Sequence, residues 1–455
     1  MLSRPAVWSV GTRGVGAAFG FLSVLLVSHR LSPAEQGIYY TYASLLALLT
    51  VAEFGLSYAV MQGASHNSVE WTAGGHAVGD PGALRHLATL ARRAFAWLAV
   101  ESVLAGATLL VVGAALLGTS PAGAAGSARP LWAVTLVAGI CWQLVNPFVS
   151  VLEGAGRVTG VWRLRFLQEV AGGLVLCGAL AARAGVASFA LSYAARALVG
   201  AAVVYALYRH SGLPRGAADP AFRWRETIWP FQWRVGASTL SGYILFQSFA
   251  PLMLVLAGPV VAGQFGMTLA ITNAVLAATT GWPASQAPRY GALIARGAFR
   301  DLDAAFARTA VGSALLSLAG VATALAAVSL LGVTDNPLRA RLLPPAALAW
   351  IVSTAFLNHL SITLATYLRA FRREPLLIPS VAGSLVTFGV MAACARWSTV
   401  EHTAVAYFLL TALGLVLTVA IFVYARRHWQ AERSPASPAA TLDGALPPVS
   451  VGAGA

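Results

Sequence analysis

The chain has 455 residues, of which 58% are hydrophobic and only 10% are charged, and its mean hydropathy is +0.72. Soluble domains carry about 25% charged residues, so this composition excludes a protein that is soluble throughout. The formal net charge is +14, and every one of the 30 basic residues is an arginine. A positive charge of this size also occurs in nucleic-acid-binding proteins, so the placement of the arginines along the chain has to decide its meaning.

Apolar stretches long enough to cross a bilayer as helices recur along the whole chain. One helical span needs roughly 20 predominantly apolar residues. The sequence therefore predicts an all-α integral membrane protein with about twelve transmembrane helices. The predicted spans lie near residues 8–29, 38–61, 90–117, 130–152, 164–182, 186–208, 232–256, 261–283, 305–332, 343–368, 376–395 and 402–425.

The arginines are concentrated on one side of these spans. Twenty-one lie at the amino end, in alternate loops or at the adjoining helix ends, six lie in the opposite loops, and three lie inside or near spans. Because arginine-rich loops stay in the cytoplasm, both termini are predicted to be cytoplasmic. Membrane topology thus accounts for the basic charge, and no nucleic-acid partner is expected.

Residues 31–46, LSPAEQGIYYTYASLL, interrupt the apolar pattern between the first two predicted spans. Pro33 and Gly37 predict a turn here, because both residue types interrupt regular structure. Three tyrosines follow, and tyrosines are enriched at membrane interfaces. We therefore predict an external hairpin that is anchored by its tyrosines and touches no substrate.

The second half of the chain repeats the pattern of the first half. Two shifts, of 226 and then 216 residues, align residues of similar character in the same order along the chain. The difference of ten residues lies in the loop at 63–87, which is longer than its counterpart. The matched pairs are Pro33–Pro259, Gly37–Gly263, Tyr39–Phe265 and Gly55–Gly281 under the first shift, and Arg92–Arg308, Leu152–Leu368, Arg157–Arg373 and Tyr208–Tyr424 under the second.

A duplication with six spans in each half predicts the architecture. Six is an even number, so both copies have the same orientation in the membrane, and the expected arrangement is two pseudo-symmetric lobes around a central cleft, as in transporters with parallel repeats. The expected parts are an N-terminal six-helix lobe at 1–210, a cytoplasmic linker at 211–227, a C-terminal six-helix lobe at 228–425 and a disordered cytoplasmic tail at 426–455.

Two segments resemble a known superfamily. Residues 27–60, VSHRLSPAEQGIYYTYASLLALLTVAEFGLSYAV, contain a helix that ends in a basic residue, an L-x-P-x-x-x-G turn, aromatic residues and a late FGL. This pattern resembles the amino-terminal signature of polysaccharide-biosynthesis flippases of the O-antigen type. Residues 151–157, VLEGAGR, resemble the loop between helices four and five of the same proteins. These flippases belong to the multidrug/oligosaccharidyl-lipid/polysaccharide (MOP) exporter superfamily.

The resemblance covers nearly the whole chain to residue 425. It implies a MATE-like fold of two V-shaped six-helix bundles, and members of this branch move lipid-linked sugars outward. The chain departs from the lipid II flippases, which carry two further helices that nothing after residue 426 supplies. It also departs from the drug-exporting branch, which keeps buried acids for cation coupling, because the only acids within predicted spans are Glu53, Glu101 and Glu169.

Three arginines are the first candidates for substrate binding. Arg196 lies midway along the sixth span, Arg13 lies within the first, and Arg234 begins the seventh. A charge inside the bilayer costs about 2.5–3.5 kcal/mol on insertion scales, so it is normally paired or faces a water-filled cavity. A guanidinium binds phosphate through two parallel hydrogen bonds, which suits a polyprenyl-pyrophosphate headgroup. The alternative for Arg13 and Arg234 is that they reach the nearby membrane surface.

Four other polar residues lie inside predicted spans. Glu53 and Glu101 each have three alternative interpretations: a partner for an arginine, a proton site or a member of a structural pair. Asn273 and His359 are cavity candidates, with hydrogen bonding between helices as the alternative. The cysteines and histidines show no spacing typical of a metal site or a disulfide, and no cofactor is expected.

The leading hypothesis from sequence is a non-enzymatic flippase of the bacterial cytoplasmic membrane. It would move a polyprenyl-(pyro)phosphate-linked oligosaccharide from the cytoplasmic to the outer leaflet by alternating access, for export of a surface polysaccharide. Its partners would be that substrate, membrane lipids and the polymerase and glycosyltransferases of the pathway; coupling to protons or sodium is left open. The alternatives are a cation-coupled multidrug exporter and a membrane enzyme that polymerises or ligates lipid-linked sugars.

Overall fold

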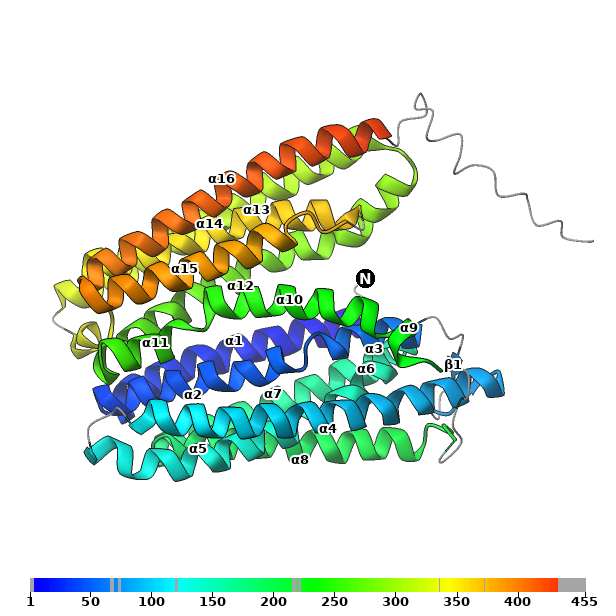
Figure 1. The fold of residues 1–455 in the computed structure, drawn as a ribbon, viewed down its shortest axis with the longest axis horizontal. Helices are drawn as coiled ribbons and strands as arrows, with labels where there is room; N and C mark the ends of the chain where they lie inside the picture. Colours follow the sequence, from blue (N-terminus) through cyan, green and yellow to red (C-terminus); the bar gives the residue numbers. More distant parts are fainter. Residues whose placement is uncertain are drawn as a thin grey trace, which may run out of the picture. The chain divides into compact units, whose positions relative to one another are not determined.

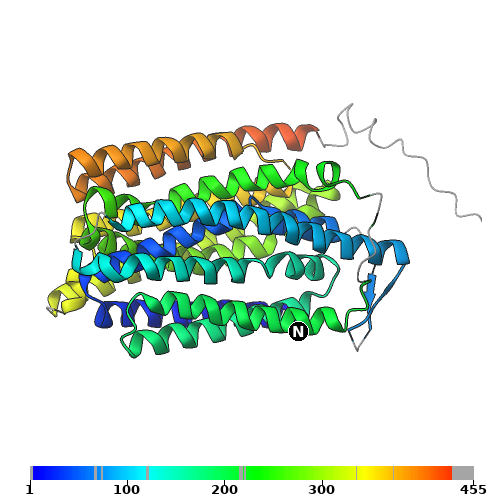
Figure 2. The same ribbon diagram turned by 60° about the horizontal axis from the view of Figure 1, so that its bottom comes forward.

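The computed structural model describes residues 4–65, 69–72, 75–118, 122–214, 219, 222–334, 336–371 and 373–432. The described elements are helices apart from one two-stranded antiparallel sheet, and the long helices of the first half run alongside one another (Figures 1 and 2). In the described part of the chain, ten helices are long and apolar enough to cross a membrane, and the number rises to 12 when each of two bent helix pairs counts as one span. The predicted fold class, a multi-pass all-α membrane protein, is confirmed.

The elements follow the order of the predicted spans, although several helices extend beyond their apolar runs and three predicted spans are each divided into two helices. In the first half they are α1 (Arg4–Arg30), α2 (Pro33–Ala52), α3 (Leu56–Ser65), β1 (Val69–Trp71), β2 (Ala77–Gly79), α4 (Pro81–Gly118), α5 (Ala122–Gln143), α6 (Asn146–Gly154), α7 (Val158–Ala181) and α8 (Ala187–Arg209). In the second half they are α9 (Trp224–Thr227), α10 (Trp229–Phe246), α11 (Phe249–Leu256), α12 (Pro259–Ala295), α13 (Phe299–Val333), the 3-10 helix η1 (Pro337–Arg341), α14 (Pro345–Ala370), α15 (Leu377–Trp397) and α16 (Val400–Glu432).

The contacts group the chain into two compact units. The first unit contains residues 1–270, 329–348 and 384–403, and the second contains residues 271–328, 349–383 and 404–455. The predicted lobe and linker boundaries stay a prediction. Of the expected tail, the first residues belong to α16, and residues 433–455 lie outside the described part of the chain.

The segment predicted as an external hairpin is helical in the structure. Ser32 caps α2 by accepting from the Glu35 amide at 3.2 Å, and the Glu35 carboxylate accepts from the Ser32 amide at 2.8 Å. This reciprocal capping box starts the helix at Pro33, which is well suited to a first helical position. Gly37 therefore lies inside α2 and makes no turn, so that part of the prediction was wrong.

The tyrosines of α2 are packed inside the first unit. Tyr39 is 6% exposed and Tyr42 is fully buried. The ring of Tyr39 lies 4.4 Å from the ring of Phe189 on α8, and that of Tyr42 lies 5.2 Å from Trp132 on α5. The prediction that they anchor the chain at the membrane surface was wrong, because neighbouring helices cover this face of α2.

The two predicted repeat copies meet at matched residues within the first unit. A β-carbon added to Gly37 would collide with the carbonyl oxygen of Pro259, and one added to Gly263 would lie 2.9 Å from the Gly37 nitrogen. Gln36 is 1% exposed and donates to the Gly263 carbonyl at 2.9 Å. Gly37 of α2 thus contacts the start of α12, and Gly263 of α12 contacts the first turns of α2. Such reciprocity is expected of elements related by a twofold axis.

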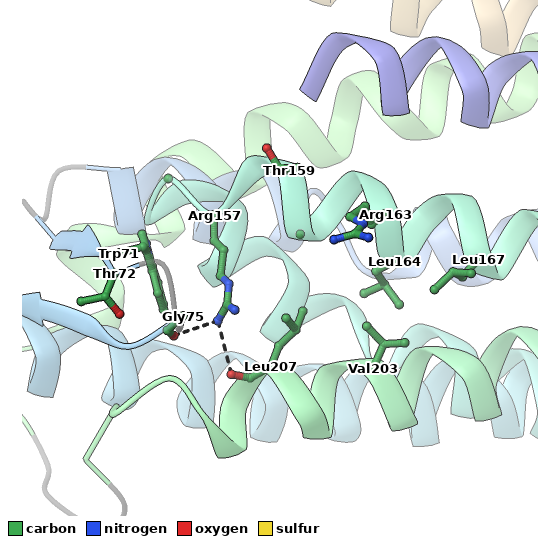
Figure 3. A pocket seen from close by; sticks show the side chains of 12 residues that line it. Trp71, Thr72, Gly75, Arg157, Thr159, Arg163, Leu164, Leu167, Val203 and Leu207 are labelled. Carbon is green, nitrogen blue, oxygen red and sulfur yellow. Dashed lines mark hydrogen bonds between the residues drawn. The ribbon is translucent and has the colours of Figure 1, made fainter. Parts of the chain in front are cut away.

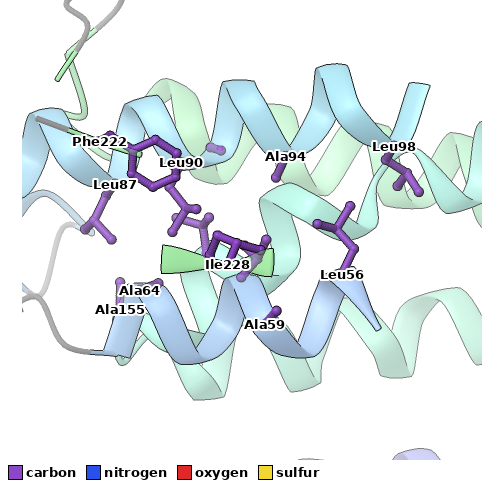
Figure 4. Packing of buried hydrophobic residues seen from close by; sticks show 13 residues of the cluster. Leu56, Ala59, Ala64, Leu87, Leu90, Ala94, Leu98, Ala155, Phe222 and Ile228 are labelled. Carbon is purple, nitrogen blue, oxygen red and sulfur yellow. The ribbon is translucent and has the colours of Figure 1, made fainter. Parts of the chain in front are cut away.

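Apolar clusters at equivalent ends of the helices also follow the repeat. In the first unit, α3 and α4 pack around Ile228, which is completely buried (Figure 4). In the second unit, the end of α12 packs against α13, α14 and α16 around Tyr290 and Tyr367. Under the two shifts, Tyr290 matches Ala64 and Tyr367 matches Val151, both of which belong to the first cluster.

The small sheet occupies the loop that differs between the copies. β1 pairs with β2 in antiparallel register, with Val69 opposite Gly79 and Trp71 opposite Ala77. The Trp71 indole donates to the Ala155 carbonyl at 2.6 Å, which fixes the hairpin to the loop before α7. This hairpin accounts for the additional length of the segment at 63–87 in the first copy.

Candidate functional site

The helix predicted as the second span is broken near its middle. α2 ends at Ala52, α3 begins at Leu56, and the two halves are bent by 40°. Phe54 and Gly55 have φ of 51° and 76°, in the left-handed region that interrupts an α-helix. A β-carbon on Gly55 would lie 2.7 Å from Val235 on α10, so the close approach of α10 also requires glycine at this position.

A second interruption lies beside the first. α5 ends at Gln143 and α6 begins at Asn146, and α6 packs against α3. The buried Gln143 side chain donates to the Leu49 carbonyl at 2.8 Å, in the last turn of α2. Interrupted membrane helices expose backbone carbonyls and half-helix ends, and transporters use such ends to bind ions and substrates.

Two carboxylates face this pair of interruptions. Glu53, only 7% exposed, accepts from the Ser57 amide at 2.9 Å and also contacts the Asn146 side chain. Glu101 on α4 accepts from the Trp97 indole at 2.5 Å through one carboxylate oxygen. Its other oxygen is buried and has no hydrogen-bond partner among the described residues. The two carboxylates are close enough to repel each other. We call Glu53, Glu101, Gln143 and Asn146 the acidic break.

Aromatic rings extend from the acidic break along α4. Trp97 stacks on Trp224 with ring centroids 5.5 Å apart and planes at 24°, and it meets Trp229 edge to face at 6.4 Å. Such faces bind organic cations through the ring quadrupole and also stack on flat apolar faces of ligands. A carboxylate with an unused oxygen, bonded to an indole that itself contacts two more indoles, is therefore suited to a proton, an inorganic cation or an organic cation.

Arg196 is paired with Glu169. Its two terminal nitrogens lie 2.5 and 3.0 Å from the two carboxylate oxygens of Glu169, a bidentate pair between α8 and α7. Gln168 donates to the backbone carbonyl of Arg196 at 3.1 Å. The sequence left open a paired or a functional role for this arginine, and the geometry supplies the pair. A phosphate would have to compete with Glu169 for the same guanidinium edge.

Within the first unit, Arg13 and Arg234 make no described hydrogen bond or ion pair with the acidic break. Arg13 is exposed on α1, and Arg234 is exposed on α10 with its guanidinium 5.7 Å from the adjacent Trp233 ring. Asn273 and His359 belong to the second unit. His359 is fully buried, and its Nε2 lies 3.0 Å from the Ser313 hydroxyl, which fits hydrogen bonding between α14 and α13.

The repeat pairs each residue of the acidic break with a residue in the second copy. The second-copy residues carry no acid, and α12 runs without interruption through the region where α2 is broken. The Thr279 hydroxyl there donates to the Val275 carbonyl at 3.0 Å inside its own helix. The matched pairs are Glu53–Thr279, Trp97–Ser313, Glu101–Ser317, Gln143–His359 and Asn146–Ile362.

Sequence reasoning identified the two acids but missed their neighbours. Gln143, Asn146 and Trp97 are neutral. Neutral polar and aromatic residues are common in membrane helices, so their presence alone does not indicate a site. The useful signal is the repeat itself, because a position that is acidic in one copy and hydroxyl-bearing in the other indicates a site that only one copy holds. Among the described residues, no group of three histidine, cysteine or acidic side chains gathers to hold a metal ion.

Comparisons with known proteins identify the fold. No family model and no curated protein sequence matches the chain. Solved structures do match. An inward-facing multidrug-resistance MATE family transporter of the MOP superfamily superposes with a TM-score of 0.72 at 14% identity, covering 94% of this chain and 100% of that one. The MATE multidrug transporter DinF-BH, solved in a complex, gives a TM-score of 0.60 at 14% identity over 94% of this chain and 96% of that one.

A third match is a MOP superfamily transporter from Pyrococcus furiosus, described as having a binding pocket of reverse polarity that suggests a different function. Its TM-score is 0.55 at 15% identity, with 95% of this chain and 96% of that chain covered. At such identities the likeness shows the fold alone. The chain has the fold of MATE and MOP superfamily transporters over nearly its whole length.

Proposed function

We propose that the chain is a cation-coupled exporter of amphiphilic molecules that works by alternating access, with the acidic break as its coupling site. The supporting observation is the break between α2 and α3, which holds the buried Glu53 carboxylate, with the Glu101 carboxylate of α4 near enough to interact with it electrostatically. Two acids in a site of low dielectric gain from sharing a proton or binding a cation, because either relieves their repulsion. The MATE-like fold supports a transport function.

The acidic break can couple ion binding to movement through the helix interruption. Glu53 is the C-cap of α2, so its carboxylate lies where the carbonyl end of one half-helix adds partial negative charge. A bound cation would hold the half-helices α2 and α3 together with the neighbouring helices α4 and α6 around this charge. When the cation leaves, repulsion between the acids returns and favours a different bend. Substrate would be released in one state and the cation in the other.

Gradient-driven transport by purified protein in sealed vesicles tests this proposal. A cationic rhodamine dye is the probe, with a proton gradient or a sodium gradient imposed separately. The expected result is dye movement driven by one of the gradients and its loss in the Glu101→Gln variant. Glu226→Gln is the matched control, because Glu226 is an exposed acid of the same unit. Gradient-dependent transport that survives in Glu101→Gln and in Glu53→Gln would contradict the assignment.

A second candidate function is the flippase for polyprenyl-(pyro)phosphate-linked oligosaccharides in a bacterial cytoplasmic membrane. The resemblance of residues 27–60 and 151–157 to polysaccharide flippases favours it. The pairing of Arg196 with Glu169 weakens it, because the arginine with the most central position is already neutralised. The test is expression of the chain in a bacterium that lacks its own flippase and accumulates the lipid-linked precursor. Restoration of surface polysaccharide in that strain would support this function over drug export.

A further inference from the structure

A cavity of about 510 Å³ lies in the first unit, and none of the residues of the acidic break line it (Figure 3). It is formed where the start of α7, the end of α8 and the β1–β2 hairpin meet. Its walls are polar and basic at the ends of the helices and apolar deeper along them. The lining residues are Trp71, Thr72, Gly75, Gly156, Arg157, Thr159, Gly160, Arg163, Leu164, Leu167, Val203 and Leu207.

The charged residues that line the cavity are both arginines. Arg157 is held with its guanidinium 5.0 Å from the Trp71 ring, and its Nη1 donates to the Gly75 carbonyl at 3.1 Å and the Leu207 carbonyl at 3.5 Å (Figure 3). Arg163 stands between one and two turns further along α7, with its guanidinium 5.2 Å from the ring of Trp8. Among the described residues, the hydrogen bonds of Arg157 engage only Nη1, so its other N–H groups can bind an anion.

Burial makes an anion favourable at this position. Arg157 is half-buried and the described lining of the cavity includes no carboxylate, so its charge is only partly compensated by carbonyl groups. Burial lowers the pKa of the Arg157 guanidinium from its usual value, although arginine stays charged at neutral pH. An anion in the cavity would offset the desolvation of this charge directly.

The start of α7 adds a second attraction for an anion. α7 is 24 residues long, and Arg157 at its N-cap makes no side-chain capping hydrogen bond. The first turn of a helix has unpaired N–H groups and the positive end of the helix dipole. Thr159 and Gly160, both in this first turn, line the cavity. Gly160 has no side chain, so its backbone lines the same space as the two arginines.

The deeper part of the cavity is suited to an acyl chain. Leu164 and Leu167 on α7 face Val203 and Leu207 on α8, and Leu167 is 46% exposed. Leu167 follows Val158 by nine residues, so it lies roughly 14 Å further along the helix axis. This depth takes the apolar wall from the headgroup region into the hydrocarbon. A free inorganic anion would use only the basic end.

We propose that this cavity binds an anionic phospholipid, with its headgroup phosphate at Arg157 and Arg163 and one acyl chain along Leu167 and Val203. Basic pockets between membrane helices bind anionic headgroups in this way. The phosphate accepts hydrogen bonds from the two guanidinium groups and the first turn of α7. The bound lipid ties the β1–β2 hairpin to α7 and α8 through Trp71 and Arg157.

Lipid retention by the purified full chain tests this proposal without any transport measurement. The protein is exposed to an equal mixture of phosphatidylglycerol and phosphatidylcholine, and the lipid that stays bound is identified by native mass spectrometry. Wild type is expected to retain phosphatidylglycerol in preference. The Arg157→Gln/Arg163→Gln variant is expected to lose that preference by about tenfold, because two charge-assisted contacts are removed.

Arg373→Gln is the matched control, since Arg373 is the repeat counterpart of Arg157 and also stacks on a tryptophan, Trp429, at 5.1 Å. It should retain phosphatidylglycerol like wild type. The double variant could fail to fold because it loses the Arg157 hydrogen bonds. The Arg163→Gln single variant then serves as the test, because Arg163 is exposed and its replacement should not affect folding. Equal retention of both lipids by wild type, or unchanged preference in Arg163→Gln, would overturn the proposal. So would displacement of the lipid by millimolar inorganic phosphate, which would indicate a free-anion site.

Discussion

The two copies of the repeat use the same helix positions for different chemistry. The first copy places Glu53 at the break between α2 and α3 and Glu101 on the continuous helix α4, whereas the second places Thr279 and Ser317 at the matched positions of the continuous helices α12 and α13. Thr279 satisfies its hydroxyl within its own helix, whereas the buried Glu53 carboxylate accepts from the Ser57 amide on the other side of the break. An opened backbone thus supplies a donor to Glu53, and α12 has no such opening at the matched position. The comparison indicates two similar scaffolds, of which the first alone carries the acids of the proposed coupling site.

Exchange of the chemistry between the copies should have the largest effect. A Glu53→Thr/Glu101→Ser variant gives the first copy the residues of the second. We expect gradient-driven transport to fall at least about tenfold. Removal of each charged ligand costs more binding free energy than the roughly 1.4 kcal/mol that corresponds to a tenfold change. Initial rates in vesicles at equal protein content measure this. Thr279→Ser/Ser317→Ala, altered at the matched positions, should keep more than half of the rate. Equal losses in the two variants would show that the copies do not differ in function.

The reciprocal contact between the copies should be next in size. Gly37→Ala places a methyl group against the Pro259 carbonyl, and overpacking of this kind costs about 1–3 kcal/mol. Gly242→Ala is the control, because an added β-carbon there meets no atom within 4 Å and the gain in helix propensity is about 0.5–1 kcal/mol. Unfolding in detergent measures the free energy difference. Equal stability of the two variants would exclude close contact at Gly37.

The ion pair of the first copy should have an intermediate effect. The matched residues in the second copy are Leu385 and Ala412, so the pair has no counterpart there. Arg196→Gln leaves the Glu169 carboxylate without its cation and should destabilise the protein by about 1–3 kcal/mol. Arg196→Gln/Glu169→Gln should recover at least half of the loss, because no unpaired charge remains. If transport falls in the double variant while stability is recovered, the arginine also serves substrate binding, as the sequence hypothesis holds.

The hydroxyl positions of the second copy should have the smallest effect. The Ser317 hydroxyl is buried without a hydrogen-bond partner among the described residues, so Ser317→Ala should change stability by less than about 1 kcal/mol and in the stabilising direction. Ser313→Ala removes the partner of His359 and should cost about 0.5–1.5 kcal/mol. Unfolding transitions of both variants measure the contrast. A larger loss for Ser317→Ala than for Ser313→Ala would reveal a polar role that the structure does not explain.

The fold could be predicted from composition because the bilayer limits the choices. Apolar runs of roughly 20 residues must be helices, and the arrangement of arginines and the internal repeat order them. The local conformation of residues 31–46 was less predictable. Pro33 and Gly37 are common in turns, but here proline starts a helix and glycine allows a close helix contact, which depends on Pro259 far along the chain.

The candidate site could be predicted only in part, for a similar reason. Glu53 and Glu101 are conspicuous because acids are rare in membrane helices, but their proximity follows from the packing of α3, α4 and α6. Gly55 and its match Gly281 are both glycine, yet only Gly55 has a positive φ. The break is set by the approach of Val235 and by the needs of a buried acid. Both causes depend on residues distant in the sequence.

The β1–β2 hairpin records a change that followed the duplication. It fills the segment whose length differs between the two halves, so under the predicted duplication one half gained these residues or the other lost them. The described contacts that attach the hairpin to its surroundings include those of Trp71 and Arg157 and a hydrogen bond from the Ala77 amide to the Ser211 carbonyl at 2.8 Å. Trp71 and Gly75 also form one wall of the cavity beside α7 and α8. A loop as short as the one in the second half would therefore remove this wall and release the Arg157 guanidinium.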